Sequence, residues 1–248
     1  MSEKLQNTFR NLNKKSYKAY KDLTGKRYGF DDYELIFDHI QGDPFAAPSK
    51  ISVEVDLSKT GFPTELFDTP VKSKAFRDAL SRVVAKQIKR HVAGRRGTGG
   101  SGSVIINSGA QKILERNSIV IKDNAILVRL LAGLPAFGRR IAGDHALEMF
   151  FKELPSVIHN ALFWKHLDHS YFTTFVDLLQ KQEKIRSELR ERGLISFIAD
   201  DSVLPRSSGI EDTPLSDAVP FTPPESLRTS FSFQDGTTIT GMGIKRGI

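Results

Sequence analysis

The chain has 248 residues, 39% hydrophobic and 26% charged, which is ordinary for a globular protein with a substantial core. It has no cysteine, which excludes disulfides, thiolate zinc sites and cysteine nucleophiles, and no run approaches the roughly 18 apolar residues of a membrane span. The net charge of +7 favours polyanionic partners, and without a signal peptide or membrane segment we expect a cytoplasmic protein.

The first half of the chain predicts two helices and two strands. Leu5, Phe9 and Leu12 share one helix face, which predicts a helix over 3–13. Residues 33–40 and 51–57 read as strands, with a Gly- and Pro-punctuated loop between them. The clearest helix covers 70–92, with an apolar stripe on one face and mostly basic residues on the other.

The second half mixes hairpins with helices. Residues 103–107 read as a short strand, and 117–132 as a hairpin that turns near Asp123-Asn124. A glycine-bounded loop at 133–143 precedes two predicted helices, roughly 144–164 and 170–192.

The last part of the chain begins with a strand over 194–199, and an Asp-, Ser- and Pro-rich connection follows over 200–224. Two final strands are joined through Asp235-Gly236. Helices interspersed with antiparallel hairpins indicate the α+β class rather than regular β-α-β alternation.

The run GTGGSG at 97–102 fits the pattern G-x-G-x-x-G of nucleotide-binding loops. Such a loop needs a strand before the glycines and a helix after them, so that helix amides face the phosphates. Here a basic helix precedes the run, a β-branched strand follows it, and no Lys-Ser or Lys-Thr closes it. We therefore expect a flexible loop, either in contact with polynucleotide phosphates or as a disordered linker after a solvated helix face.

Basic residues gather around this run and in the 133–143 loop. Arginines suit phosphates because guanidinium groups form forked hydrogen bonds. The alternative for the second loop is anchoring by salt bridges to nearby acids. The candidate nucleic-acid-binding residues are Lys86, Lys89, Arg90, Arg95, Arg96, Lys112, Arg116, Arg139 and Arg140.

Aromatic residues alternate with basic ones in the segment SYKAYKDLTGKRYGF, at Tyr17, Tyr20, Tyr28 and Phe30. Single-strand binders use aromatic faces for bases and cations for phosphates, although such aromatics also pack in cores.

The sequence predicts no metal site and no catalytic residue. His166, Asp168 and His169 have helical spacing but no evident third ligand. A nuclease-like role would need a pocket that gathers two or more of the scattered acids. These acids are Asp38, Asp43, Asp200, Asp201, Glu211 and Asp212.

Six separate segments match one family in order and spacing. They read SYKAYKDLTGKRY, YELIFDHIQGDPFAAPSKISVEV, GLPAFGRRIAG, GLISFIADDSVLPRSSGIEDTPL, AVPFTPPESL and TITGMGIKRGI. From about residue 15 to the last residue, the chain closely resembles the N-terminal part of the predicted ATPases of the ABC class. The resemblance implies an accessory α+β domain over 1–224 and the opening strands of an ABC-type ATPase core over 225–248.

The family's glycine-rich G-K-S-T loop follows soon after the segment that reads TGMGIKRGI here, so the resemblance implies a fragment that ends before it. ATP and Mg²⁺ would be cofactors of the full-length protein, with none bound and no ATP hydrolysed by this fragment. ABC-type cores commonly stack an early aromatic on adenine. Phe233 resembles that aromatic, with Phe231 as the neighbouring choice; the alternative is that both are core residues.

The resemblance also implies binding of RNA or single-stranded DNA outside the ATPase core, in agreement with the basic patches. Our main hypothesis is an N-terminal nucleic-acid-binding domain that grips phosphates through a basic helix and Gly/Arg loops. The alternative is a structural or regulatory domain that docks on the ATPase core of the same protein, or forms a homodimer, without binding nucleic acid.

Overall fold

The centre of the fold is an antiparallel sheet in the order β1-β2-β3-β6-β4, with β5 also paired to β6. In this computed structural model, which describes residues 2–247, β3 pairs with β6 from Ser49↔Ala132 to Asp56↔Ala125. Side chains alternate along β3, so every second one faces the core. The strands are β1 (Arg27–Gly29), β2 (Glu34–His39), β3 (Ser49–Asp56), β4 (Val104–Ile105), β5 (Ile119–Lys122) and β6 (Ala125–Ala132).

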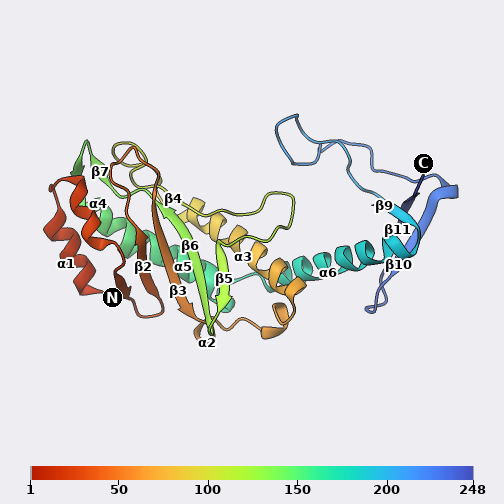
Figure 1. The fold of residues 1–248 in the computed structure, drawn as a ribbon, viewed down its shortest axis with the longest axis horizontal. Helices are drawn as coiled ribbons and strands as arrows, with labels where there is room; N and C mark the ends of the chain where they lie inside the picture. The colour runs from red at the N-terminus through yellow and green to blue at the C-terminus, as the bar shows by residue number, and fades with distance from the viewer. Residues whose placement is uncertain (1, 248) are drawn as a thin grey trace.

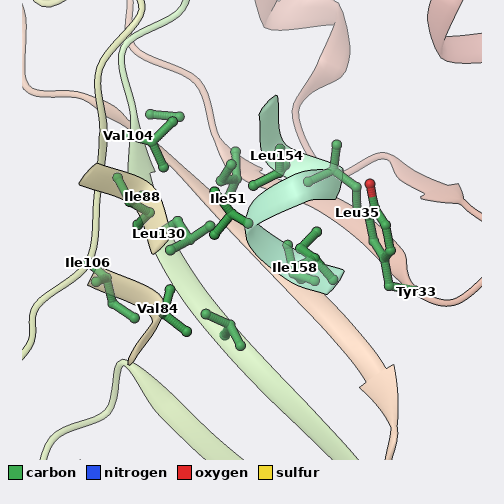
Figure 2. Close-up of a cluster of buried hydrophobic side chains, with 14 of the residues drawn as sticks. Tyr33, Leu35, Ile51, Val84, Ile88, Val104, Ile106, Leu130, Leu154 and Ile158 are labelled. Carbon is green, nitrogen blue, oxygen red and sulfur yellow. The ribbon is translucent and has the colours of Figure 1, made fainter. Parts of the chain in front are cut away.

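Helices α3 (Pro70–His91) and α5 (Leu154–Leu162) pack against each other and against one face of this sheet. α3 begins where the Thr69 side chain accepts the Lys72 amide, with Pro70 in the first helical position. Figure 2 shows the core between the layers, and its labelled residues include Ile51, Val84, Ile88, Leu130, Leu154 and Ile158.

The N-terminal helix α1 (Glu3–Leu12) packs against α4 (Gly143–Glu148). Its Phe9 ring stacks on Phe150, with the ring centroids 5.4 Å apart. A π-helical turn, Met149–Glu153, joins α4 to α5. The short helix α2 (Leu57–Thr60) follows β3, 3₁₀ turns cover Tyr17–Leu23, Thr64–Leu66, Trp164–His166 and Glu225–Leu227, and a small hairpin pairs β7 (Ala136–Phe137) with β8 (Arg140–Ile141).

Helix α6 (His169–Glu191) leads from this body to a separate three-stranded sheet in the order β10-β11-β9 (Figure 1). Its buried residues, Phe172, Val176 and Leu179, all lie in its first half, where it packs against α3. The small sheet is made of β9 (Leu194–Ala199), β10 (Arg228–Ser232) and β11 (Thr238–Lys245).

The α+β class is confirmed, as are the long helix over 70–92 and the hairpin at Asp123-Asn124. Both turn residues have left-handed φ values, 51° and 61°, as a tight two-residue hairpin turn requires. The boundary at 224/225 stays a prediction; β9 pairs with β11, so 194–199 belong to the same sheet as the last two strands. Within the described residues, no helix is long and apolar enough to cross a membrane.

Candidate nucleic-acid interface

The glycine-rich loop 97–102 is fixed by hydrogen bonds to two loops that are distant in the sequence. The Thr98 amide donates to the Ala136 carbonyl at 2.8 Å, and the Gly100 amide donates to the Pro44 carbonyl at 3.1 Å. The Ser101 side chain is fully buried beside them. Three loops, 41–48, 94–103 and 133–143, therefore form one interlocked unit, which we call the loop junction.

Glycine is required here because the backbones approach too closely for a side chain. A Cβ at Gly133 would lie 1.9 Å from the Gly100 carbonyl oxygen, and one at Gly99 would lie 2.1 Å from that of Pro44. Gly99 also has φ +62°, a conformation that glycine adopts readily. The expectation of a flexible or disordered loop is therefore wrong: the glycines serve close packing.

The stretch from residue 70 to 96 carries nine lysines and arginines and only one acid, Asp78. Each of the four cations from Lys72 to Arg82 has an acidic partner within 4 Å. The ion pairs of the whole stretch are Lys72–Asp68, Lys74–Glu183, Arg77–Glu115, Arg82–Asp78, Arg96–Glu148 and Arg96–Glu153. The neutralised charges thus lie mainly at the N-terminal end of α3.

The cations at the C-terminal end of α3 differ. Lys86, Lys89, Arg90 and Arg95 are exposed, and among residues 2–247 no ion pair engages any of them. Cations near a helix C-terminus are favoured by the helix dipole, which accounts for part of this pattern. Arg95 lies beyond the helix, so the dipole does not explain its position.

Two of the predicted phosphate-binding residues form ion pairs with acids of the fold. The Arg96 side chain is only 12% exposed and pairs with Glu148 and Glu153. Arg116 lies 2.5 Å from the fully buried Asp78 carboxylate. Because these guanidinium groups compensate acids of the fold, we assign them a structural role in place of the predicted phosphate contact.

The remaining candidates are exposed at the loops. Lys112 is exposed on the segment between β4 and β5. Arg139 is 81% exposed at its side chain and its Nε lies 3.0 Å from an Asp43 carboxylate oxygen, so the salt-bridge alternative applies to it. Arg140 is exposed and donates to the Lys14 carbonyl at 3.3 Å.

The tyrosines are not base-stacking residues, because they are buried. The Tyr20 hydroxyl donates to the Pro135 carbonyl at 2.9 Å, and Tyr17 donates to the Leu134 carbonyl at 3.4 Å. Burial, and then the Asp43 charge, raises the pKa of Tyr17 well above its usual value. These tyrosines therefore hold the 133–143 loop to the core through their hydroxyl groups. The sequence did not single out Phe45 and Phe137, which are 71% and 58% exposed on the loop junction.

The histidine cluster has a structural explanation. Asp168 caps α6 by accepting the Ser170 amide at 3.0 Å; hydrogen bonds from the Ser170 hydroxyl and the Tyr171 amide lower the pKa of this carboxyl. His169 stacks on Trp164 at 4.0 Å. Within the described part of the chain, no three His, Asp or Glu side chains are placed to share a metal ion.

The candidate acids are engaged in separate places. Asp38 accepts the Ser52 hydroxyl at 2.7 Å on the main sheet, and Asp200 pairs with Arg228 at 2.7 Å in the small sheet. The geometry therefore supports no acid–base site built from these two groups.

Of the two phenylalanines compared with an adenine-stacking aromatic, Phe231 is fully buried and Phe233 is half-buried. The Lys181 and Lys184 ammonium groups lie 5.6 and 5.2 Å from the Phe233 ring centroid. Residues 1–248 contain no G-x-x-x-x-G-K-[ST] run, so these residues alone do not fit the phosphates of ATP. We derive no step of nucleotide chemistry from them, and adenine stacking by Phe233 stays a prediction.

Comparison with known families matches residues 2–165 to the family described as ATPase of the ABC class N-terminal. Residues 168–248 match the ABC_ATPase P-loop domain, which indicates nucleotide and Mg²⁺ use in that family. The two matches meet between the turn Trp164–His166 and α6. No curated protein matches the chain.

Proposed function

The chain belongs to the family of ABC-class ATPases, and from that premise we propose that its N-terminal region binds RNA or single-stranded DNA. The phosphates contact Lys86, Lys89, Arg90 and Arg95 at the C-terminal end of α3, with the loop arginines beside them. In the intact ATPase this region positions the polynucleotide, while ATP and Mg²⁺ belong to the P-loop domain.

One observation carries the proposal: acids neutralise the cations at the start of α3 and leave those at its end uncompensated. Lys86 and Arg90 are one helical turn apart, about 6 Å along the axis, so their charges share one face. Uncompensated cations attract phosphates without reading sequence, because the attraction comes from releasing counterions. A cluster of this kind suits an irregular single strand.

The test is a fluorescence-anisotropy titration with labelled RNA, single-stranded DNA and duplex DNA at two salt concentrations. Four phosphate contacts on a single strand predict a log–log salt slope of about −2.8, which is a roughly 50-fold loss of affinity between about 50 and 200 mM salt. The double variant K89A/R90A removes two contacts, so its slope is expected to fall to about −1.4.

A matched control removes the same charge elsewhere. Arg190 and Lys245 are exposed, lie at the other end of the molecule and make no ion pair among the described residues. R190A/K245A should therefore leave the slope within about 0.5 of wild type. Equal losses in both double variants would refute a site at α3, and no binding at low salt would refute the function.

A second function, docking on the ATPase core or homodimer formation, is favoured by apolar side chains on the 200–224 segment. Leu204, Ile210 and Val219 are exposed there, Ile210 by 97%. Exposed apolar groups in one segment are typical of a protein contact. Sedimentation velocity over a range of concentrations tests this function: I210D should weaken any self-association. A monomer at all concentrations would refute the homodimer. The remaining form is a contact of this segment, itself within the P-loop-domain match, with the rest of the ATPase core, and it is refuted if I210D leaves the thermal stability of the intact ATPase unchanged.

A further inference from the structure

We propose that a cavity beside the loop junction receives one unstacked base of the bound single strand, against the ring of Phe137. This inference rests on the proposed function and adds base contact to it. The cavity has a volume of about 470 Å³ and opens between the β7–β8 hairpin, the end of α1 and the start of α4. Its lining residues include Asn13, Lys14, Phe137, Arg140, Asp144 and His145.

Aromatic rings form one part of the wall. The Phe137 and His145 rings meet edge to face, with centroids 5.3 Å apart, and Phe137 still keeps 58% of its surface exposed. An exposed ring of this kind offers a π-face to a base, and stacking tolerates any base because every base has such a face. The aromatic segment predicted from sequence is buried, so Phe137 takes the role that the tyrosines cannot.

The hairpin that carries Phe137 is fixed by hydrogen bonds to its backbone on two sides. The Thr98 amide donates to the Ala136 carbonyl, and the Gly138 amide donates to the Thr98 hydroxyl at 2.8 Å. On the other side, Tyr17 donates its amide to the Arg139 carbonyl at 2.8 Å. Binding therefore orders little of the protein, which favours affinity.

Polar groups at the cavity fit a base with its phosphate. His145 Nδ1 is buried and has no hydrogen-bond partner among the described residues, which leaves one polar position of a cavity-lining ring unfilled. Asp144 can only accept hydrogen bonds when ionised, which favours base amino groups over phosphate near it. Lys14 and Arg140 are exposed cations at the same cavity and suit the flanking phosphate.

The experiment compares F137A, F137L and F137W with wild type in anisotropy titrations of a labelled RNA oligomer and an abasic oligomer of equal length. Loss of base stacking should weaken RNA binding by F137A about 5-fold or more, with F137L close to F137A and F137W close to wild type. The abasic oligomer should bind wild type and F137A alike. Thermal denaturation should be unchanged, because the replaced ring is more than half exposed.

The matched control is F45A, which removes another exposed phenylalanine from the loop junction that does not line the cavity. Its affinity should stay within twofold of wild type. An equal loss in F45A and F137A, an equal loss for the abasic oligomer, or full affinity in F137L would each overturn the base pocket. If F137A binds RNA normally while K89A/R90A does not, the pocket fails and the proposed function stands; if wild type binds no nucleic acid, both fail.

Discussion

Replacing Arg96 with alanine tests whether this arginine holds the loop junction to the helices. Arg96 pairs with Glu153, a carboxylate that is only 8% exposed, and with Glu148 at 3.0 Å. Removing one partner of a buried ion pair costs about 3–5 kcal/mol, because the other charge is left without compensation. Glu153 keeps one hydrogen bond, from the Ala93 amide at 3.2 Å, so we expect the lower end, about 3 kcal/mol.

Urea unfolding followed by fluorescence measures this loss, because the single tryptophan, Trp164, packs in the body of the fold. With a slope of about 2–3 kcal/mol/M, the midpoint should fall by about 1 M or more. The neighbouring R95A is the control, since Arg95 is exposed and should change stability by less than about 0.5 kcal/mol. Equal stabilities of R96A and R95A would refute the structural role, and R95A alone remains suitable for testing phosphate contact.

Two further predictions concern close packing and a surface ion pair. G133A should lower the free energy of unfolding in urea by about 1–3 kcal/mol, because its Cβ would lie 1.9 Å from the Gly100 carbonyl oxygen. The control is G42A, whose Cβ would meet no atom within 4 Å and which should leave stability unchanged. Similar urea midpoints for the two variants would contradict the clash. The Lys181 ammonium, and then Thr237, lowers the pKa of Asp235, so this group stabilises the fold at neutral pH and loses that contribution as pH falls through its lowered folded-state pKa. K181M should raise the Asp235 pKa toward its usual range in an NMR titration of the carboxyl carbon, and an unchanged titration would refute the pairing.

Local patterns were enough to predict much of the fold. The apolar stripe of 70–92 follows helical spacing, and α3 covers Pro70–His91. The alternation at 51–57 and the turn at Asp123-Asn124 likewise depend on neighbours in the sequence, and the structure has a strand and a hairpin there. The π-helical turn at Met149–Glu153 was not predicted, because apolar periodicity does not distinguish it from an α-helix.

The candidate site was less predictable because its geometry depends on contacts between distant residues. Arg95 and Arg96 look equivalent in the sequence, yet only Arg96 meets Glu148 and Glu153, which are 52 and 57 residues away. The rigidity of GTGGSG likewise depends on carbonyls of two other loops. A glycine signals a permissive backbone, and only the fold shows whether that freedom serves motion or close contact.

Helix α6, which opens the P-loop-domain match, forms a stiff arm between the body of the fold and the small sheet. Twenty-three residues of helix span about 35 Å, so a tilt of about 10° at one end displaces the other by about 6 Å. Its buried residues lie in the first half, where it packs against α3, and the Lys74–Glu183 ion pair adds a contact just beyond them. Its far end leads into β9 (Figure 1). A small tilt where α6 meets α3 would therefore move the small sheet by slightly more than the ~5.4 Å pitch of one helical turn, so that the helix acts as a lever.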